Sequence, residues 1–175
     1  EVWHAEHPQK GESICKMIWA KSLHDEYQLW CFDAEVTLCS LKLIDHPAIP
    51  KLIHWGENQD VDCWYTLFEY RKGQTLDESV KRSTYSVDQA RGLFIQLADA
   101  LVRYHSEGML HRKIHPSHII LNISEATLIS FHWAEGVDGQ DELTQHQETY
   151  RSLGQKPRFM APEILEGAPL SEKSD

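Results

Sequence analysis

The sequence lacks the features of a membrane protein, a nucleic-acid-binding protein or a secreted precursor. No apolar run approaches the ~20 residues that a transmembrane helix needs. The first ten residues are polar and include Pro8, unlike a signal peptide. The net charge is −10, whereas nucleic acids and anionic membranes favour basic surfaces. We therefore expect neither a nucleic acid nor a membrane as the partner.

Cysteine is scarce and forms no recognisable motif. Cys15, Cys31, Cys39 and Cys63 include no C-x-x-C pair, so zinc-ribbon and thioredoxin-like sites have no support. The four residues could form two disulfides, but nothing else in the sequence is typical of a secreted protein. Buried free thiols in a reducing compartment are the simpler interpretation. We expect a cytoplasmic protein.

Short apolar segments of changing periodicity make up the rest of the chain. In chain order they predict a strand at Ser13–Trp19, a helix at Glu26–Ile44, strands at Ile49–Trp55 and Trp64–Tyr70, a short helix at Leu76–Lys81, a long helix at Val87–Glu107, a hairpin of Ile119–Leu121 with Thr127–Ile129, and a short helix at Ala161–Glu166. Residues 130–155 read as a long polar loop. This order indicates an α+β fold with a strand-rich lobe and a helical lobe.

The long helix has the clearest boundaries. Ser86 is a favourable N-cap, and Gly108 lies where a C-terminal glycine is common. Apolar residues at helical spacing predict the face that packs on the core: Ala90, Leu93, Phe94, Leu97, Leu101 and Tyr104.

Six segments carry motifs in a recognisable order. They are Gly11–Met17, similar to a strand with V-A-I-K; Phe32–Glu35 followed by Asp45–Ile49, similar to a helix with an H-P-x-I exit; Leu67–Tyr70 with Gly73; His111–Leu121, similar to H-R-D-x-K-P-x-N; Ser130–His132, in the place of D-F-G; and Pro157–Glu163, similar to P-x-Y-M-A-P-E. Together they resemble the eukaryotic-type protein kinase domain of the Ser/Thr class.

The resemblance implies a bilobal fold that covers nearly the whole chain. Residues 1–70 would form a partial N-lobe that begins after the first strand of the family's fold. Residues 71–175 would form the hinge and the first part of the helical C-lobe, with the catalytic-loop and activation-segment equivalents. The resemblance also implies that the sequence stops before the large C-lobe helices.

Three positions that carry the family's chemistry are replaced. Lys113 stands at the position of the catalytic base, and an ordinary lysine is protonated at neutral pH and cannot accept a proton. His118 and Ser130 stand at the two magnesium-binding positions, and neither supplies a carboxylate to a hard cation that prefers oxygen ligands. The resemblance therefore implies that no catalytic residue is intact and that there is no magnesium site.

The nucleotide contacts are less altered. Lys16 and Met17 are both candidates for the phosphate-binding lysine position, and they would point to opposite faces of the strand. Glu35 is the candidate partner of that lysine, or alternatively a residue on a solvated helix face. The hinge near Glu69 and Tyr70 could still contact a nucleotide base through its backbone. We expect no required cofactor, and any ATP to bind weakly and nearly independently of magnesium.

The leading hypothesis is a pseudokinase that acts in signalling as a scaffold or allosteric regulator of a partner protein. An active, atypical Ser/Thr kinase and a nucleotide sensor without turnover remain alternatives. A transition-metal site formed by His115, His118 and His132 is a weaker hypothesis, and three drifted positions filled by polar residues are the simpler explanation of those histidines.

Overall fold

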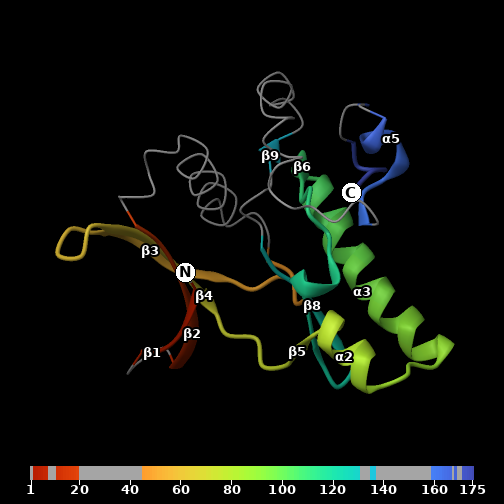
Figure 1. Cartoon of the computed structure of the whole chain (residues 1–175), viewed down its shortest axis with the longest axis horizontal. Helices are drawn as coiled ribbons and strands as arrows, with labels where there is room; N and C mark the ends of the chain where they lie inside the picture. Colours follow the sequence, from red (N-terminus) through yellow and green to blue (C-terminus); the bar gives the residue numbers. More distant parts are fainter. Residues whose placement is uncertain are drawn as a thin grey trace.

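A computed structural model of the chain describes residues 2–7, 11–19, 45–130, 135–136, 159–166, 168 and 171–175. The predicted helix at 26–44, including Glu35, and most of the predicted loop at 130–155 lie outside these residues. The described part contains a strand-rich lobe and a helical lobe, which lie side by side (Figure 1). The α+β, bilobal, protein-kinase-like fold predicted from the sequence is confirmed.

The strand-rich lobe is built on a four-stranded antiparallel sheet with the order β1-β2-β4-β3. Its strands are β1 (Val2–His7), β2 (Gly11–Trp19), β3 (Leu52–Asn58) and β4 (Cys63–Glu69). Each strand carries one tryptophan: Trp3, Trp19, Trp55 and Trp64. The sequence did not define β1, and β3 lies three residues further along the chain than the strand predicted at Ile49–Trp55.

The helical lobe begins after the hinge. Its elements are β5 (Gln74–Thr75), α2 (Leu76–Arg82), α3 (Val87–His105), β6 (Met109–Leu110), the 3-10 turn η2 (Pro116–His118), β7 (Ile119–Asn122), β8 (Glu125–Leu128), β9 (Glu135–Gly136) and α5 (Pro162–Leu165). Strands β5, β7 and β8 form one sheet, and β6 pairs with β9. No described helix is long and apolar enough to cross a bilayer.

Helix α3 begins where its cap predicts. The Ser86 side chain accepts from the backbone N–H of Gln89, and the Gln89 side chain accepts from the backbone N–H of Ser86. This reciprocal pair satisfies two backbone donors that the first turn leaves open. The helix ends at His105, and Gly108 follows with φ of +71°. Both ends therefore agree with the prediction to within two residues.

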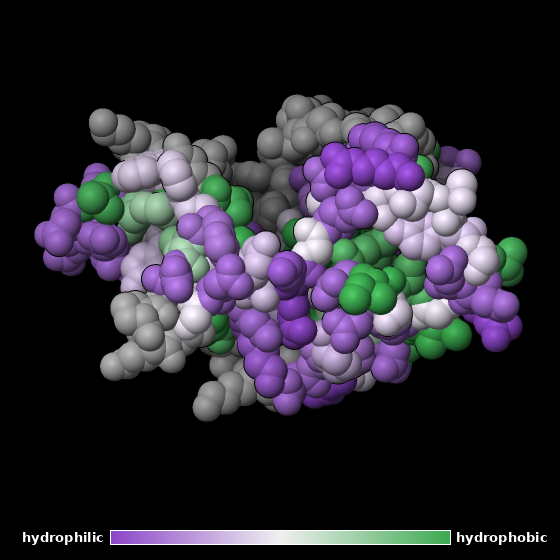
Figure 2. Space-filling view, turned by 90° about the horizontal axis from the view of Figure 1, so that it is seen from below, coloured by the Kyte–Doolittle hydropathy of each residue, from purple (hydrophilic) through white to green (hydrophobic). Residues whose placement is uncertain are grey.

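The core lies between α3 and the β7–β8 hairpin. Its buried residues are Ala48, Ile49, Leu93, Leu97, Ala100, Tyr104, Ile119, Leu121, Ala126 and Leu128. The prediction that Phe94 faces this core is wrong, because its side chain is 66% exposed. The inward face is narrower than the apolar stripe, and other apolar side chains lie at the surface of the helical lobe, among polar ones (Figure 2).

Two glycines give opposite expectations for stability. A Cβ at Gly73 would lie 2.3 Å from the Leu121 carbonyl oxygen, where β5 meets β7, whereas a Cβ at Gly92 in α3 would meet nothing within 4 Å. We expect Gly73→Ala to lower the free energy of unfolding by about 2–3 kcal/mol through overpacking. Gly92→Ala should raise it by about 0.5–1 kcal/mol, because alanine is favoured in a helix interior. Urea unfolding of the two variants checks this, and equal effects would contradict the described packing.

Candidate functional site

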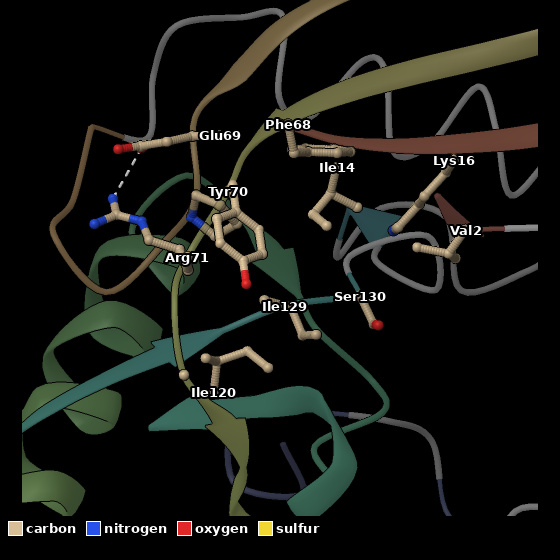
Figure 3. Close-up of a pocket in the computed structure, with 12 residues that line it drawn as sticks. Val2, Ile14, Lys16, Phe68, Glu69, Tyr70, Arg71, Ile120, Ile129 and Ser130 are labelled. Carbon is tan, nitrogen blue, oxygen red and sulfur yellow. Dashed lines mark hydrogen bonds and ion pairs between the residues drawn. The ribbon is translucent and has the colours of Figure 1, made fainter. Parts of the chain in front are cut away.

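A pocket of about 240 Å³ lies between the four-stranded sheet and the β7–β8 hairpin. Apolar side chains form its walls, a lysine and a serine lie together on one side, and the hinge closes the other (Figure 3). The lining residues are Val2, Ile14, Lys16, Pro50, Phe68, Glu69, Tyr70, Arg71, Gly73, Ile120, Ile129 and Ser130. A slot of this kind suits a flat apolar group with a polar or anionic end.

The strand register decides between Lys16 and Met17. Lys16 is the Cα partner of Val2 on β1 and of Thr66 on β4, and Ile14 is the partner of Phe68. Since side chains alternate along a strand, Ile14 and Lys16 share the face that lines the pocket, and Met17 belongs to the opposite face. The Lys16 ammonium lies 5.2 Å from the centre of the Phe68 ring, within cation–π range. The predicted partner Glu35 lies outside the described residues.

The hinge follows β4 directly. The backbone N–H of Glu69 donates to the Lys51 carbonyl at 2.8 Å, and the Arg71 guanidinium donates to the Glu69 carboxylate at 3.0 Å. Tyr70 lies beside the His4 ring, with 4.6 Å between ring centres. The structure thus brings two of the predicted cofactor-binding residues, Glu69 and Tyr70, to the same pocket as Lys16.

A buried carboxylate holds the loop that carries Lys113, the residue predicted at the position of the catalytic base. The Asp175 carboxylate accepts from the backbone N–H of His111 at 2.6 Å and from that of Arg112 at 2.5 Å. It also lies 3.0 Å from Nε2 of His105, and its side chain is 2% exposed. Arg112 has φ of +68°, which a non-glycine residue rarely adopts without such support. Asp175 was missed from the sequence, because it is 63 residues from Arg112 and belongs to no local motif.

His111 is fully buried and bridges the loop to the end of the hairpin. Its Nε2 donates to the Ile129 carbonyl at 3.1 Å, and its Nδ1 accepts from the backbone N–H of Lys113 at 3.3 Å. Burial lowers the pKa of His111 to about 4, although the charge of Asp175 opposes this shift. The ring is therefore neutral at physiological pH, in the tautomer that these two hydrogen bonds require.

Of the three residues predicted at replaced catalytic positions, Lys113 and His118 lie on this loop, and Ser130 follows β8. His118 Nδ1 is 2.9 Å from the Lys113 carbonyl oxygen, and the His118 carbonyl accepts from the backbone N–H of Ile129 at 2.9 Å. Ser130, the next residue, lines the pocket with φ of +73°. The structure therefore brings His118 and Ser130 close together through a short backbone connection, with Lys113 bonded to His118.

His115 takes part in a separate set of contacts. Its Nδ1 accepts from the backbone N–H of Ser117 at 3.1 Å and lies 2.7 Å from the Ser117 hydroxyl. Its ring meets Phe159 edge to face, with 4.5 Å between ring centres. This contact joins the loop to the segment before α5.

The pKa of His118 is lowered from its ordinary value. Burial is the main cause that lowers its pKa, and the hydrogen bond to the Lys113 carbonyl raises it. The charges of Lys113, His115 and Lys16 lower the pKa further.

Magnesium does not fit the described part of this site. Lys113, His118 and Ser130 offer an ammonium, an imidazole and a hydroxyl, whereas a hard cation prefers carboxylate oxygens. Of the carboxylates described nearby, Asp175 accepts hydrogen bonds from the loop and Glu69 is paired with Arg71. Among the described residues no group of three His, Cys, Asp or Glu side chains could hold a metal ion. His132, which the transition-metal hypothesis needs, lies outside them.

Comparisons with known proteins agree with the fold. The sequence model of the family described as Protein kinase domain matches residues 2–175. The chain is 26% identical over 180 residues to serine/threonine-protein kinase pkn2 of Myxococcus xanthus, covering 100% of this chain and 21% of that protein. It is 25% identical over 166 residues to CBL-interacting protein kinase 26 of Oryza sativa subsp. japonica, covering 94% of this chain and 32% of that protein.

Human serine/threonine-protein kinase STK11 is 30% identical over 129 residues, which cover 73% of this chain and 29% of that protein. The match thus spans about a fifth to a third of the length of these curated relatives. The match of the family model over residues 2–175, with the lobes and the pocket described above, shows that the chain belongs to the protein kinase family.

Proposed function

We propose that this chain is a catalytically inactive kinase domain that acts by binding a partner protein, as a scaffold or an allosteric regulator in signalling. The observation that carries the proposal is Lys113 at the position of the catalytic base, beside His118 and Ser130 at the two magnesium positions. Phosphoryl transfer in this family relies on positioning and on neutralising charge with metal ions. A protonated lysine in place of the base, with no oxygen ligand at His118, removes both contributions.

The scaffold that remains supports a binding role. Asp175 and His111 still fix the loop, and the pocket still has its apolar walls and Lys16. A protein is the proposed partner because the net charge of −10 disfavours nucleic acid. The cytoplasm is the proposed compartment, since Cys15 and Cys63 are free thiols and such thiols persist where the environment is reducing.

A nucleotide sensor without turnover is the second candidate. The observation that favours it is the pocket itself, in which Lys16 and the hinge residues Glu69 and Tyr70 line one cavity with apolar walls. Weak ATP binding is compatible with the scaffold role, because a bound nucleotide would stabilise the folded lobes by mass action. A third candidate function, suggested by the names of the relatives, is that of an active, atypical Ser/Thr kinase.

Radiolabelled phosphate transfer by the purified full-length protein tests the proposal. With ATP and either Mg²⁺ or Mn²⁺, we expect no incorporation above the blank, against roughly 1–100 per second for working kinases. The matched variant Lys113→Asp/His118→Asn/Ser130→Asp restores the family's side chains on the same backbone and serves as the gain-of-function comparison. Wild-type transfer at ordinary kinase rates that Lys113→Ala abolishes would show that the proposal is wrong.

A further inference from the structure

The rings of His4 and Tyr70 meet at the hinge end of the pocket. The centres of the two rings lie 4.6 Å apart, and the ring planes are inclined by 44°. Tyr70 lines the cavity, and its ring extends from the hinge toward the side on which Ile129 lies (Figure 3). The contact therefore joins β1 of the sheet to the hinge, across one end of the cavity.

The strand register shows how far the Tyr70 side chain reaches. His4 is the Cα partner of Ile14 on β2, and Ile14 is the partner of Phe68 on β4. Cross-strand partners share a face of the sheet, so His4 belongs to the face that lines the pocket. Two strand spacings, about 10 Å, separate His4 from Phe68. Tyr70 follows Phe68 by two residues and still contacts His4, so its side chain extends past Ile14 along the cavity side of β2.

Both ends of this contact are held in place. Nε2 of His4 lies 3.2 Å from Oε1 of Glu12, and the two side chains are 52% and 58% exposed. An exposed pair of this kind adds little to stability, so its effect is to orient the His4 ring. At the hinge, the backbone N–H of Glu69 donates to the Lys51 carbonyl at 2.8 Å. Rotation of the Tyr70 side chain between staggered rotamers is therefore the movement that separates the two rings.

The cavity is small while the rings are in contact. Its volume, about 240 Å³, is below the ~300–1,000 Å³ typical of pockets for drug-sized ligands. Because the Tyr70 side chain forms part of the lining, turning this ring away from His4 enlarges the cavity at the hinge end. The contact expected between the hinge and a nucleotide base uses backbone groups, so the Tyr70 side chain is not required for it.

We propose that Tyr70 and His4 form a gate at the hinge end of the pocket, which their ring contact holds closed, and that a flat heterocyclic ligand binds only after Tyr70 turns away. The inference goes beyond the proposed scaffold role, because it describes when the pocket is accessible and does not depend on whether phosphate is transferred. The apparent dissociation constant of such a ligand is the intrinsic value divided by the fraction of molecules with an open gate. Weakening the ring contact therefore strengthens binding, whereas losing a ligand contact would weaken it.

Calorimetric titration of the full-length protein with adenosine, an uncharged heterocyclic probe without phosphates, tests the gate. We expect His4→Ala to lower the dissociation constant about fivefold, the size of one aromatic ring contact. Tyr70→Ala should lower it at least as much. Adding His4→Ala to Tyr70→Ala should change nothing further, because the two residues act through one contact. Tyr70→Phe keeps the ring and should bind adenosine as the wild type does.

His54→Ala is the matched control, because His54 stacks on Tyr65 with 5.8 Å between ring centres on the same sheet, and neither residue lines the pocket. Glu12→Gln should lower the dissociation constant about twofold, since the His4 ring loses its orienting partner. Glu6→Gln, at the cross-strand partner of Glu12, should keep the wild-type value. Weaker binding in Tyr70→Ala, additive effects in the double variant, or no adenosine binding by any variant would overturn the inference. None of these outcomes measures phosphate transfer, so the proposed inactivity is judged separately by the radiolabel assay.

Discussion

Replacing Asp175 with alanine is expected to lower the free energy of unfolding of the helical lobe by about 3–5 kcal/mol, because it removes a buried carboxylate that accepts several hydrogen bonds. The carboxylate accepts from the backbone N–H groups of His111 and Arg112 and lies against His105. Alanine would leave both backbone donors buried without an acceptor. It would also remove the support for the positive φ of Arg112.

A second aspartate–histidine pair provides the control. Asp99 lies 3.0 Å from Nε2 of His46, the same separation as in the Asp175–His105 pair, but its side chain is 73% exposed. Asp99→Ala should therefore cost less than about 1 kcal/mol. Hydrogen exchange of the His111 and Arg112 amides in the full-length protein, with urea unfolding, measures both variants. A similar loss of unfolding free energy in Asp175→Ala and Asp99→Ala would mean that burial does not determine the strength of the Asp175 contacts.

Acid should destabilise the same loop through His111. Burial lowers the pKa of His111 from its ordinary value of 6.5 to about 4 in the folded protein. Between these pH values the unfolded chain binds a proton that the folded ring does not, so stability is greatest above pH 6.5 and falls as the pH decreases. The full interval corresponds to a loss of about 3 kcal/mol, at 1.36 kcal/mol per pKa unit. Burial also lowers the pKa of His118, which adds a loss of the same sign.

His111→Gln should make unfolding less sensitive to pH over this interval, because glutamine does not titrate. The comparison is the slope of unfolding free energy against pH in wild type and variant, since other groups titrate equally in both. His54→Gln, at an exposed ring on β3, should keep the wild-type slope. A slope in His111→Gln as steep as that of the wild type would contradict the assignment of a neutral, buried His111.

Local patterns were sufficient for much of the fold. Ser86 and Gly108 determined the ends of α3, and the apolar runs around β4 and β7 located those strands to within a residue. Capping and alternation depend on neighbours in the sequence, so they can be read from it directly. The width of the buried face of α3 could not be predicted from the sequence, because it depends on the hairpin that packs against the helix. Phe94 was therefore placed in the core wrongly.

The candidate site was harder to predict from the sequence than the fold. Motif spacing predicts Lys113, His118 and Ser130 as site positions, but which of Lys16 and Met17 lines the pocket depends on the pairing of β2 with β4. A shift of one residue exchanges the two faces of a strand, and no residue in Gly11–Met17 fixes that choice. Asp175 acts across 63 residues on backbone groups, which leave no sequence signal. Contacts between residues so far apart in the sequence can be identified only from the structure.

The distribution of tryptophan gives the two lobes separate optical signatures. Trp3, Trp19, Trp55 and Trp64 all belong to the four-stranded sheet, one on each strand, and the other two tryptophans, Trp30 and Trp133, lie outside the described residues. In a variant with phenylalanine at those two positions, indole emission would come from the strand-rich lobe alone. All the helices among the described residues, α2, α3 and α5, belong to the other lobe, so their far-ultraviolet circular dichroism would report on that lobe. The order in which the lobes lose structure, and the lobe that a ligand stabilises, could then be read from one sample without attached dyes.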